Sequence, residues 1–378
     1  MAESSLDPST GSARRRFFRP SRAAALLFVG VIGCSDGRRI APVLPDADLT
    51  STPLFVLEEV PNVPLGDFSA LLRWRDGWVL ADGTNQQIVL FDSTGHRLGS
   101  LGRPGAGPDE FRRLGPLALL DDTTIIALDI DLQRLSRWDL VKRGQVGIER
   151  AVSAPNVPTL LLHRADGILI GDIYAKDLFS LELVDSVTLA PIRRAAKAPG
   201  LYHASPYVAG SFASVSVVPI GDSLLIGWQL VDSMQMLGPS LEPGRMISVP
   251  VSRRRGSPPD LIQRGKNYGD VVGMIPHTSL MSRLGLLADG RIGVIHVDLI
   301  RKDNGKGRTR AGSREVWLSV LDHTGTPLCV DQRIAARTED VVRSYFIRGE
   351  LVVFRTGADD GMTRVSRVEV PAECGGRQ

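Results

Sequence analysis

Carboxylate side chains recur at the same position of a repeated unit in this sequence, directly after short apolar runs. Asp82, Asp129 and Asp172 each follow the predicted second strand of a repeated unit. Carboxylates that converge on one point could hold a hard cation such as calcium, which prefers oxygen ligands. Aspartate at the end of a strand also closes turns by accepting backbone hydrogen bonds, and we favour this structural role for all three.

Other residue types that could do chemistry lack the spacing that it needs. The histidines show no zinc-site spacing, the asparagines do not recur at one position of the repeat, and no Gly-x-Ser-x-Gly nucleophile elbow is present. We therefore expect no cofactor, no metal site and no catalytic residue. The histidines are His96, His163, His203, His277, His296 and His323.

Basic and aromatic residues gather in predicted loops. Basic runs within 253–266 and 301–310 could meet an anionic glycan, a lipid head group or an acidic protein, although charge runs are more often solvated loops. Tyrosines there could form an interface or pack the loops onto the fold. The candidate ligand-binding residues are Arg103, Tyr202, His203, Tyr207, Arg253, Arg254, Arg255, Tyr268 and Arg308.

The charge balance does not favour a nucleic-acid partner. Residues 1–33 hold five arginines against Glu3 and Asp7, and the remaining sequence has 40 basic and 40 acidic side chains. The overall charge of +3 therefore belongs to the N-terminal segment. We expect no nucleic-acid partner, because no basic footprint remains.

The elements that position these residues are short strands joined by tight turns. The clearest unit runs from Leu72 to Gly102 and contains four predicted strands. Four antiparallel strands form one blade of a β-propeller. The first turn of the unit recurs six times along the chain, at Asp76, Asp121, Asp166, Asp222, Asp289 and Gly349.

The sixth unit supplies only three strands, predicted at 344–347, 351–356 and 365–370. A fourth strand is available in the apolar run 54–60, and pairing it there would remove an exposed sheet edge. The sequence therefore predicts an all-β, six-bladed β-propeller of four-stranded antiparallel blades, closed by an N-terminal strand.

Residues 80–92 resemble an NHL repeat, in which an aspartate, an asparagine and a terminal Phe-Asp mark the second and third strands. Residues 127–139 keep a weaker form, and 101–111 is similar to the glycine-rich blade linker of NHL-like six-bladed bacterial lipoproteins. The resemblance covers 72–139. It also implies an alternative function, because six-bladed lactonase-like hydrolases hold an axial metal through Glu, Asn and Asp side chains.

Predicted insertions fall mostly in loops that a propeller places on one face. These are the loop between the second and third strands of a blade and the loop to the next blade. Rigid scaffolds present binding residues on such loops, so this long-loop face is the predicted binding surface. The insertions are 103–115, 191–213 and 251–278 between blades, and 232–245 and 301–314 within blades.

Residues 14–34 resemble the leader of a bacterial lipoprotein. Five arginines precede an apolar run, Ala23 to Gly33, which is too short to span a bilayer but suits a signal peptide. Residues 31–34, Val-Ile-Gly-Cys, resemble a lipobox, which implies that Cys34 is acylated. A membrane anchor or a buried helix is the alternative, and the arginines fit either a twin-arginine or an ordinary export signal.

The predicted segments are a signal peptide at 1–33, a tether at 34–52, the propeller at 53–371 and a tail at 372–378. Export would place the remaining cysteines, Cys329 and Cys374, where disulfides persist. They lie near the ends of the fifth and sixth units. The sequence leaves open whether they pair, because pairing depends on their distance.

The sequence thus predicts a protein outside the cytoplasm, attached by lipid on Cys34 to a bacterial envelope, on its periplasmic face or at the cell surface. Its long-loop face is expected to bind a protein or a carbohydrate. The alternatives are a calcium-type lactonase-like hydrolase and a structural component of an envelope complex. Four or more acidic or amide side chains at the propeller axis would favour the hydrolase.

Overall fold

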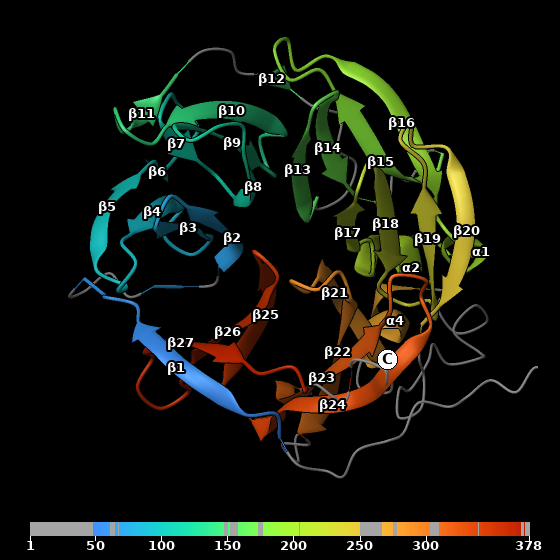
Figure 1. The fold of residues 1–378 in the computed structure, drawn as a ribbon. Coiled ribbons are helices and arrows are strands. Elements are labelled where there is room, and N and C mark those ends of the chain that lie inside the picture. Colours follow the sequence, from blue (N-terminus) through green and yellow to red (C-terminus); the bar gives the residue numbers. More distant parts are fainter. Residues whose placement is uncertain are drawn as a thin grey trace, which may run out of the picture. The chain divides into compact units, whose positions relative to one another are not determined.

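The computed structural model describes residues 48–60, 65–66, 68–146, 150–151, 158–172, 177–203, 205–249, 267–274, 278–302, 310–338, 340–371 and 374. Within them, six antiparallel sheets stand around one axis as the blades of a propeller (Figure 1). The predicted all-β, six-bladed fold is confirmed. Among the described residues, no helix has the length and apolar character needed to span a membrane.

The first three blades follow one another along the chain. Blade 1 contains β2 (Phe68–Trp74), β3 (Gly77–Asp82), β4 (Gln87–Phe91) and β5 (Arg97–Leu101). Blade 2 contains β8 (Leu114–Leu119), β9 (Thr124–Asp129) and β10 (Arg134–Asp139), with the short strands β11 (Gly144–Gln145) and β12 (Arg150–Ala151) both paired to β10. Blade 3 contains β13 (Leu160–Arg164), β14 (Gly167–Gly171), β15 (Phe179–Val184) and β16 (Pro191–Lys197).

The last three blades include the longest strands. Blade 4 contains β17 (Val215–Ile220), β18 (Ser223–Trp228), β19 (Ser233–Leu237) and β20 (Pro243–Ser248). Blade 5 contains β21 (Ser279–Leu286), β22 (Ile292–Lys302), β23 (Arg310–Leu321) and β24 (Pro327–Thr338). Blade 6 contains β25 (Val341–Ile347), β26 (Glu350–Thr356), β27 (Thr363–Val368) and β1 (Ser51–Val56).

The ring closes between the two ends of the fold, as the missing fourth strand predicted. β1 pairs antiparallel with β27, with Ser51 opposite Val368 and Val56 opposite Arg364. The closing strand begins earlier than the predicted run 54–60. It therefore includes residues that the sequence assigned to the tether.

The core lies between neighbouring blades, because each central strand is covered on both faces. In β3 every residue is buried, and successive side chains alternate between two neighbouring clusters. Val79 packs with the blade 2 residue Ile125, whereas Leu80 packs with the blade 6 residue Phe354. This two-sided burial explains why the central strands read as continuous apolar runs.

The six first-turn residues predicted from the repeat all lie between the first and second strands of their blades. The clearest conformational requirement is at Gly349, which has a φ of +82°. A Cβ atom at this position would lie 2.6 Å from the Ala288 backbone in the neighbouring blade. Glycine therefore serves both the turn and the close approach of blades 5 and 6.

Several predicted insertions are wrong in whole or in part. The insertion predicted at 301–314 is half strand, because β22 continues to Lys302 and β23 begins at Arg310. Residues 232–245 are mostly the strands β19 and β20, because Met234 and Leu237 are buried even though polar residues and prolines surround them. Residues 191–197 form β16, so the insertion predicted at 191–213 begins only after that strand.

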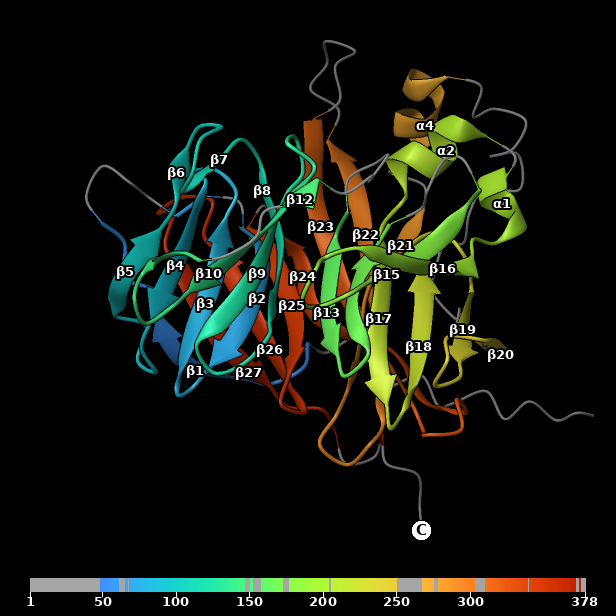
Figure 2. The same cartoon turned by 90° about the horizontal axis from the view of Figure 1, so that it is seen from above.

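The long-loop face carries the elements that are not blade strands (Figure 2). They are the helices α1 (Gly200–His203), α2 (Pro206–Ser211) and α4 (Tyr268–Met274), and the parallel pair β6 (Arg103–Pro104) and β7 (Glu110–Phe111). α2 begins where Ser205 caps it by accepting a hydrogen bond from the Val208 N–H, with a proline in the first turn.

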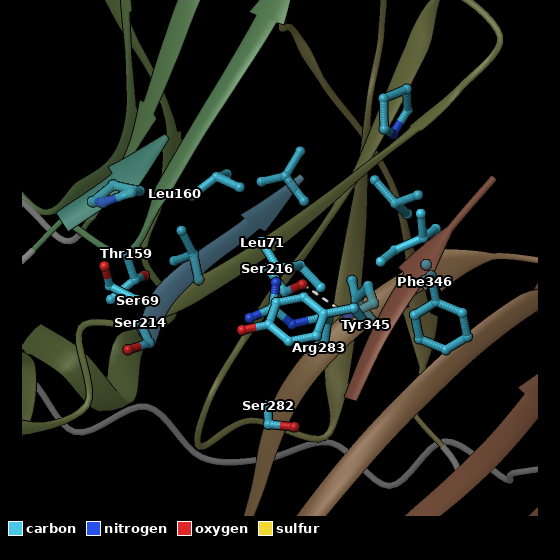
Figure 3. Close-up of a pocket in the computed structure, with 18 of the residues that line it drawn as sticks. Ser69, Leu71, Thr159, Leu160, Ser214, Ser216, Ser282, Arg283, Tyr345 and Phe346 are labelled. Carbon is cyan, nitrogen blue, oxygen red and sulfur yellow. Dashed lines mark hydrogen bonds between the residues drawn. The ribbon is translucent and has the colours of Figure 1, made fainter. Parts of the chain in front are cut away.

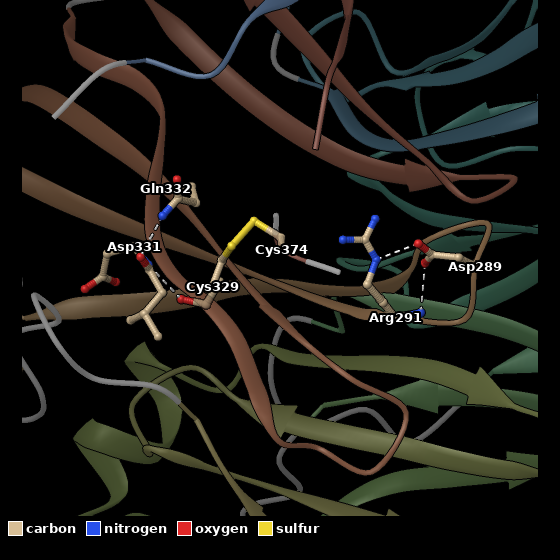
Figure 4. Close-up of a disulfide and its surroundings, with 8 residues drawn as sticks. Asp289, Arg291, Cys329, Asp331, Gln332 and Cys374 are labelled. Carbon is tan, nitrogen blue, oxygen red and sulfur yellow. Dashed lines mark hydrogen bonds and ion pairs between the residues drawn. A yellow bond between two sulfur atoms is a disulfide. The ribbon is translucent and has the colours of Figure 1, made fainter. Parts of the chain in front are cut away.

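The structure joins Cys329 and Cys374 in a disulfide, with 5.0 Å between their Cα atoms (Figure 4). Cys329 belongs to β24 of blade 5, and Cys374 follows the last strand of blade 6. Both side chains are buried in the cluster between these blades. The bridge therefore ties the end of the chain to the blade that precedes the ring closure.

Candidate functional site

A cavity of about 640 Å³ lies on the propeller axis and is lined by the first strands of all six blades. Small or flat residues on these strands, such as Gly115, Pro116 and Ser216, leave the centre hollow. The volume lies within the range of pockets that hold small molecules, which is about 300 to 1,000 Å³. The axis is therefore a candidate ligand site.

Hydroxyl groups surround the end of the cavity near the long-loop face (Figure 3). Ser69, Thr159 and Ser214 line it at or just before the starts of β2, β13 and β17. Ser282 of β21 and the amide of Gln229 add polar groups to the lining. Hydroxyl groups both donate and accept hydrogen bonds, so this part of the cavity suits a polar ligand.

Some of these hydroxyls also hold the blades in register. The Ser69 hydroxyl donates to the Gly115 carbonyl oxygen at 2.8 Å, which links blades 1 and 2. The Ser216 hydroxyl accepts a hydrogen bond from the Leu284 N–H at 2.7 Å, which links blades 4 and 5. The walls of the cavity are therefore fixed before any ligand binds.

The charged groups of the cavity are arginines. The Arg283 guanidinium carbon lies 4.4 Å from the centre of the Tyr345 ring, and Figure 3 shows the two side chains together. Arg348, on the opposite side from the hydroxyls, donates a hydrogen bond to the Arg75 carbonyl oxygen at 3.2 Å. The cavity is thus positively charged, and an anionic or neutral polar ligand fits it better than a cation.

The described residues that line the axial cavity include no Asp, Glu, His, Cys or Asn. Across the described part of the chain, no cluster of three His, Cys, Asp or Glu side chains could hold a metal ion. Gln229 is the single side-chain amide among the lining residues that the structure describes. The lining therefore does not supply the oxygen ligands that a calcium-type hydrolase would need.

The recurrent aspartates lie at or directly after the ends of the second strands and are not among the residues that line the axial cavity. Asp82 is buried, and its carboxylate accepts hydrogen bonds from the N–H groups of Thr84 and Asn85, both at 3.0 Å. Asp129 is also buried and accepts from the Arg112 N–H at 2.8 Å and the Leu132 N–H at 3.0 Å. These contacts are the structural role that we favoured for both residues.

Among the predicted ligand-binding residues, Tyr202 is not on the surface. Its side chain is buried in the core, and its hydroxyl accepts a hydrogen bond from the Leu230 N–H at 3.1 Å. The prediction is wrong for Tyr202, because α1 turns this ring toward blade 4. The neighbouring residues His203 and Tyr207 are exposed, and Tyr207 has 44% of its surface accessible.

Arg103 lies on the long-loop face, where it forms an ion pair with Glu110 at 2.9 Å. The Gly107 N–H and the Arg103 guanidinium hold the pKa of Glu110 below its usual value. The glycine-rich linker is thus a turn closed by its own carboxylate. Other predicted positions lie outside the described residues or have undescribed side chains, namely Cys34, Arg253, Arg254, Arg255, Tyr268 and Arg308.

Sequence reasoning missed Arg283 and Tyr345, which line the axial cavity, and Arg343, which lines a smaller cavity beside it. Arg283 and Arg343 lie within the first strands of blades 5 and 6, and each interrupts an apolar run. A charge inside a buried strand is uncommon, and this was the available signal. The sequence could not show that the two strands meet at the axis.

No protein-family model matches this chain, and no curated protein matches its sequence. The fold is similar to that of a Bacteroides fragilis protein provisionally named as exported (TM-score 0.57, 14% identity, 87% of this chain and 97% of that one). It is also similar to a DUF4221 family member from Bacteroides vulgatus (TM-score 0.61, 9% identity, 86% and 99%) and to YjhT (TM-score 0.51, 12% identity, 83% and 97%). At these identities the likeness shows a shared fold alone.

Proposed function

We propose that this protein is a lipid-anchored propeller of the bacterial cell envelope that binds a carbohydrate in its axial cavity. The observation that carries the proposal is the cavity itself, which combines hydroxyl, amide and guanidinium groups with apolar walls and has no carboxylate among the lining residues that the structure describes. Ligand sites are typically apolar hollows with a few placed polar groups.

A carbohydrate fits this lining better than a protein surface does. Sugar hydroxyls can exchange hydrogen bonds with Ser214, Thr159 and Gln229, which line the cavity. A protein partner would instead need a broad surface with anchoring side chains. Among the described residues of the long-loop face, Tyr207 is the tyrosine whose ring is accessible to such a partner.

Three observations support a location outside the cytoplasm. The leader at 14–34 resembles that of a lipoprotein, and the Cys329–Cys374 disulfide requires an oxidising compartment to persist. The provisional name of the similar Bacteroides fragilis protein agrees with export.

Binding is tested with the full-length protein on an array of neutral and acidic oligosaccharides. Thr159→Trp places a large side chain at the cavity, and Val187→Trp is the matched control, because Val187 is 65% exposed on an outer turn of the same blade. We expect Thr159→Trp to weaken binding at least tenfold and Val187→Trp to leave it unchanged. Glycan binding that Thr159→Trp does not affect would contradict the axial site. Capture of a protein partner without any glycan binding would contradict the proposal that the ligand is a carbohydrate.

Anchoring is tested separately with Cys34→Ala. The wild-type protein should incorporate labelled palmitate and fractionate with membranes, whereas Cys34→Ala should do neither. Membrane association that survives the substitution would contradict anchoring through lipid on Cys34.

A further inference from the structure

We propose that a smaller cavity beside the axis is an oxyanion site formed by Arg283, Arg314 and Arg343, and that the axial ligand is therefore an acidic carbohydrate. The second part rests on the proposed function, whereas the first part stands on its own geometry. The recognised group is a carboxylate, as in a uronic acid, or the phosphate of a sugar phosphate.

The smaller cavity has a volume of about 220 Å³ and is lined by residues of β2, β21, β22, β23 and β25. Three guanidinium groups line it, and none of the described lining residues carries a carboxylate. Arg283 belongs to β21, Arg314 to β23 and Arg343 to β25. Two neighbouring blades thus direct three like charges to one small space, which an oxyanion would neutralise.

The two cavities are adjacent and share wall residues. Ser69, Ser282, Arg283 and Tyr345 line both of them. The smaller cavity has room for a single acidic group, and the larger one has room for the rest of a small ligand. A ligand with its acidic group in the smaller cavity would therefore extend into the axial cavity.

Aromatic rings fix two of the three arginines. The Arg283 guanidinium carbon lies 4.4 Å from the centre of the Tyr345 ring, and that of Arg343 lies 4.5 Å from the centre of the Phe68 ring. Both rings pack against the buried Phe354, with ring centres 5.8 and 6.0 Å away. The charges are thus held in place by the core, which reduces the entropy lost on binding.

Two of the three charges of this site, those of Arg283 and Arg314, are not compensated by the residues that the structure describes. Neither Arg283 nor Arg314 forms an ion pair with any residue that the structure describes. Burial lowers the pKa of Arg314, and burial likewise lowers the pKa of Arg343. Guanidinium groups stay protonated in proteins, so the local positive charge persists at neutral pH.

A buried hydroxyl gives a second, independent indication of a ligand. Ser344 lines the smaller cavity and is only 8% exposed. Its hydroxyl has no hydrogen-bond partner among the described residues. A buried hydroxyl without a partner is uncommon and costly, and an oxyanion in the cavity would accept its hydrogen bond.

The test measures binding of four probes to the purified full-length protein by isothermal titration calorimetry. The probes are inorganic phosphate, glucuronate, glucose 6-phosphate and glucose. Arg314→Gln removes one charge without disturbing the stacked pairs, and Arg245→Gln is the matched control, because Arg245 lies on the exposed outer strand β20. Ser344→Ala removes the unpaired hydroxyl.

We expect one of the two acidic sugars to bind at least tenfold more tightly than glucose. Arg314→Gln should weaken that binding tenfold to a hundredfold, because it removes a charge-assisted hydrogen bond. Arg245→Gln should not change the binding. Ser344→Ala should weaken it about threefold to tenfold while thermal unfolding stays at the wild-type temperature. The preferred acid identifies the group as a carboxylate or a phosphate.

The other outcomes separate the two proposals. Equal binding of glucose and the acidic sugars, unchanged in Arg314→Gln, would overturn the oxyanion site and leave the carbohydrate function standing. Phosphate binding that depends on Arg314, without binding of any sugar, would support the oxyanion site and contradict the carbohydrate. No binding of any of the four probes would overturn the oxyanion site, and the array then tests the function separately.

Discussion

Reduction of the Cys329–Cys374 disulfide should destabilise the propeller by an amount set by the loop that it closes. The two cysteines are 45 residues apart in the sequence, and the intervening chain includes most of blade 6. The loss of chain entropy in a cross-linked unfolded state of this loop length corresponds to about 4 kcal/mol. For a domain of this size, that lowers the midpoint of thermal unfolding by about 6 °C.

The assay compares urea unfolding of the oxidised and reduced wild-type protein. Reduction isolates the cross-link, because both cysteine side chains are buried and the thiols keep the same neighbours. The control is a Cys329→Ala/Cys374→Ala variant, whose stability should not respond to the reductant. A reduced protein within 1 kcal/mol of the oxidised one would refute the reasoning, as would an equal effect of the reductant on the double variant.

Three further predictions concern the turns, the blade contacts and the core. Hydrogen bonds from the Thr188 backbone and hydroxyl, and from the Val187 N–H, lower the pKa of Asp185. The ionised carboxylate should stabilise the folded protein fully above the unfolded pKa of about 3.9, and this stabilisation should be lost as the pH falls through the lower pKa of the folded state. The unfolding temperature should therefore fall less between pH 5 and pH 2 in Asp185→Asn than in the wild-type protein. Gly290→Ala should lower the free energy of unfolding in urea by about 1 kcal/mol, because Gly290 has a φ of +81° and no neighbouring atoms where a Cβ would lie. Gly349→Ala should lower it by about 2 to 4 kcal/mol, because the added Cβ also clashes with the backbone of blade 5. Equal losses of stability in the two variants would contradict the close approach of blades 5 and 6 at Gly349. Tyr202→Phe should lower the free energy of unfolding by about 1 to 2 kcal/mol, because it removes the hydroxyl that accepts the hydrogen bond of the Leu230 N–H. Tyr207→Phe should have no measurable effect, because Tyr207 is exposed. A larger loss in Tyr207→Phe than in Tyr202→Phe would contradict the burial of Tyr202.

The architecture could be predicted because a propeller repeats a local pattern. Trp78 to Ala81 is an apolar run between two turns, and two-sided burial produces such a run in every central strand. β19 escaped prediction because Gln235 lies between the buried Met234 and Leu237, and Pro239 and Pro243 follow closely. Local polarity concealed a strand that contacts with neighbouring blades stabilise.

The candidate site was less predictable, because it depends on contacts between distant parts of the chain. Arg283 and Arg343 meet the same cavity although 60 positions separate them, and no local pattern records that distance. Tyr202 and Tyr207 lie in neighbouring short helices, five positions apart in the sequence. Only the packing of α1 against blade 4 decides which ring is buried.

The most direct measurement is the affinity of the full-length protein for acidic oligosaccharides from the array, compared between wild type and Thr159→Trp. The axial site predicts measurable binding by the wild-type protein and at least a tenfold loss in Thr159→Trp, with Val187→Trp unchanged. The same affinity in Thr159→Trp, or no glycan binding by a folded wild-type protein, would contradict the account.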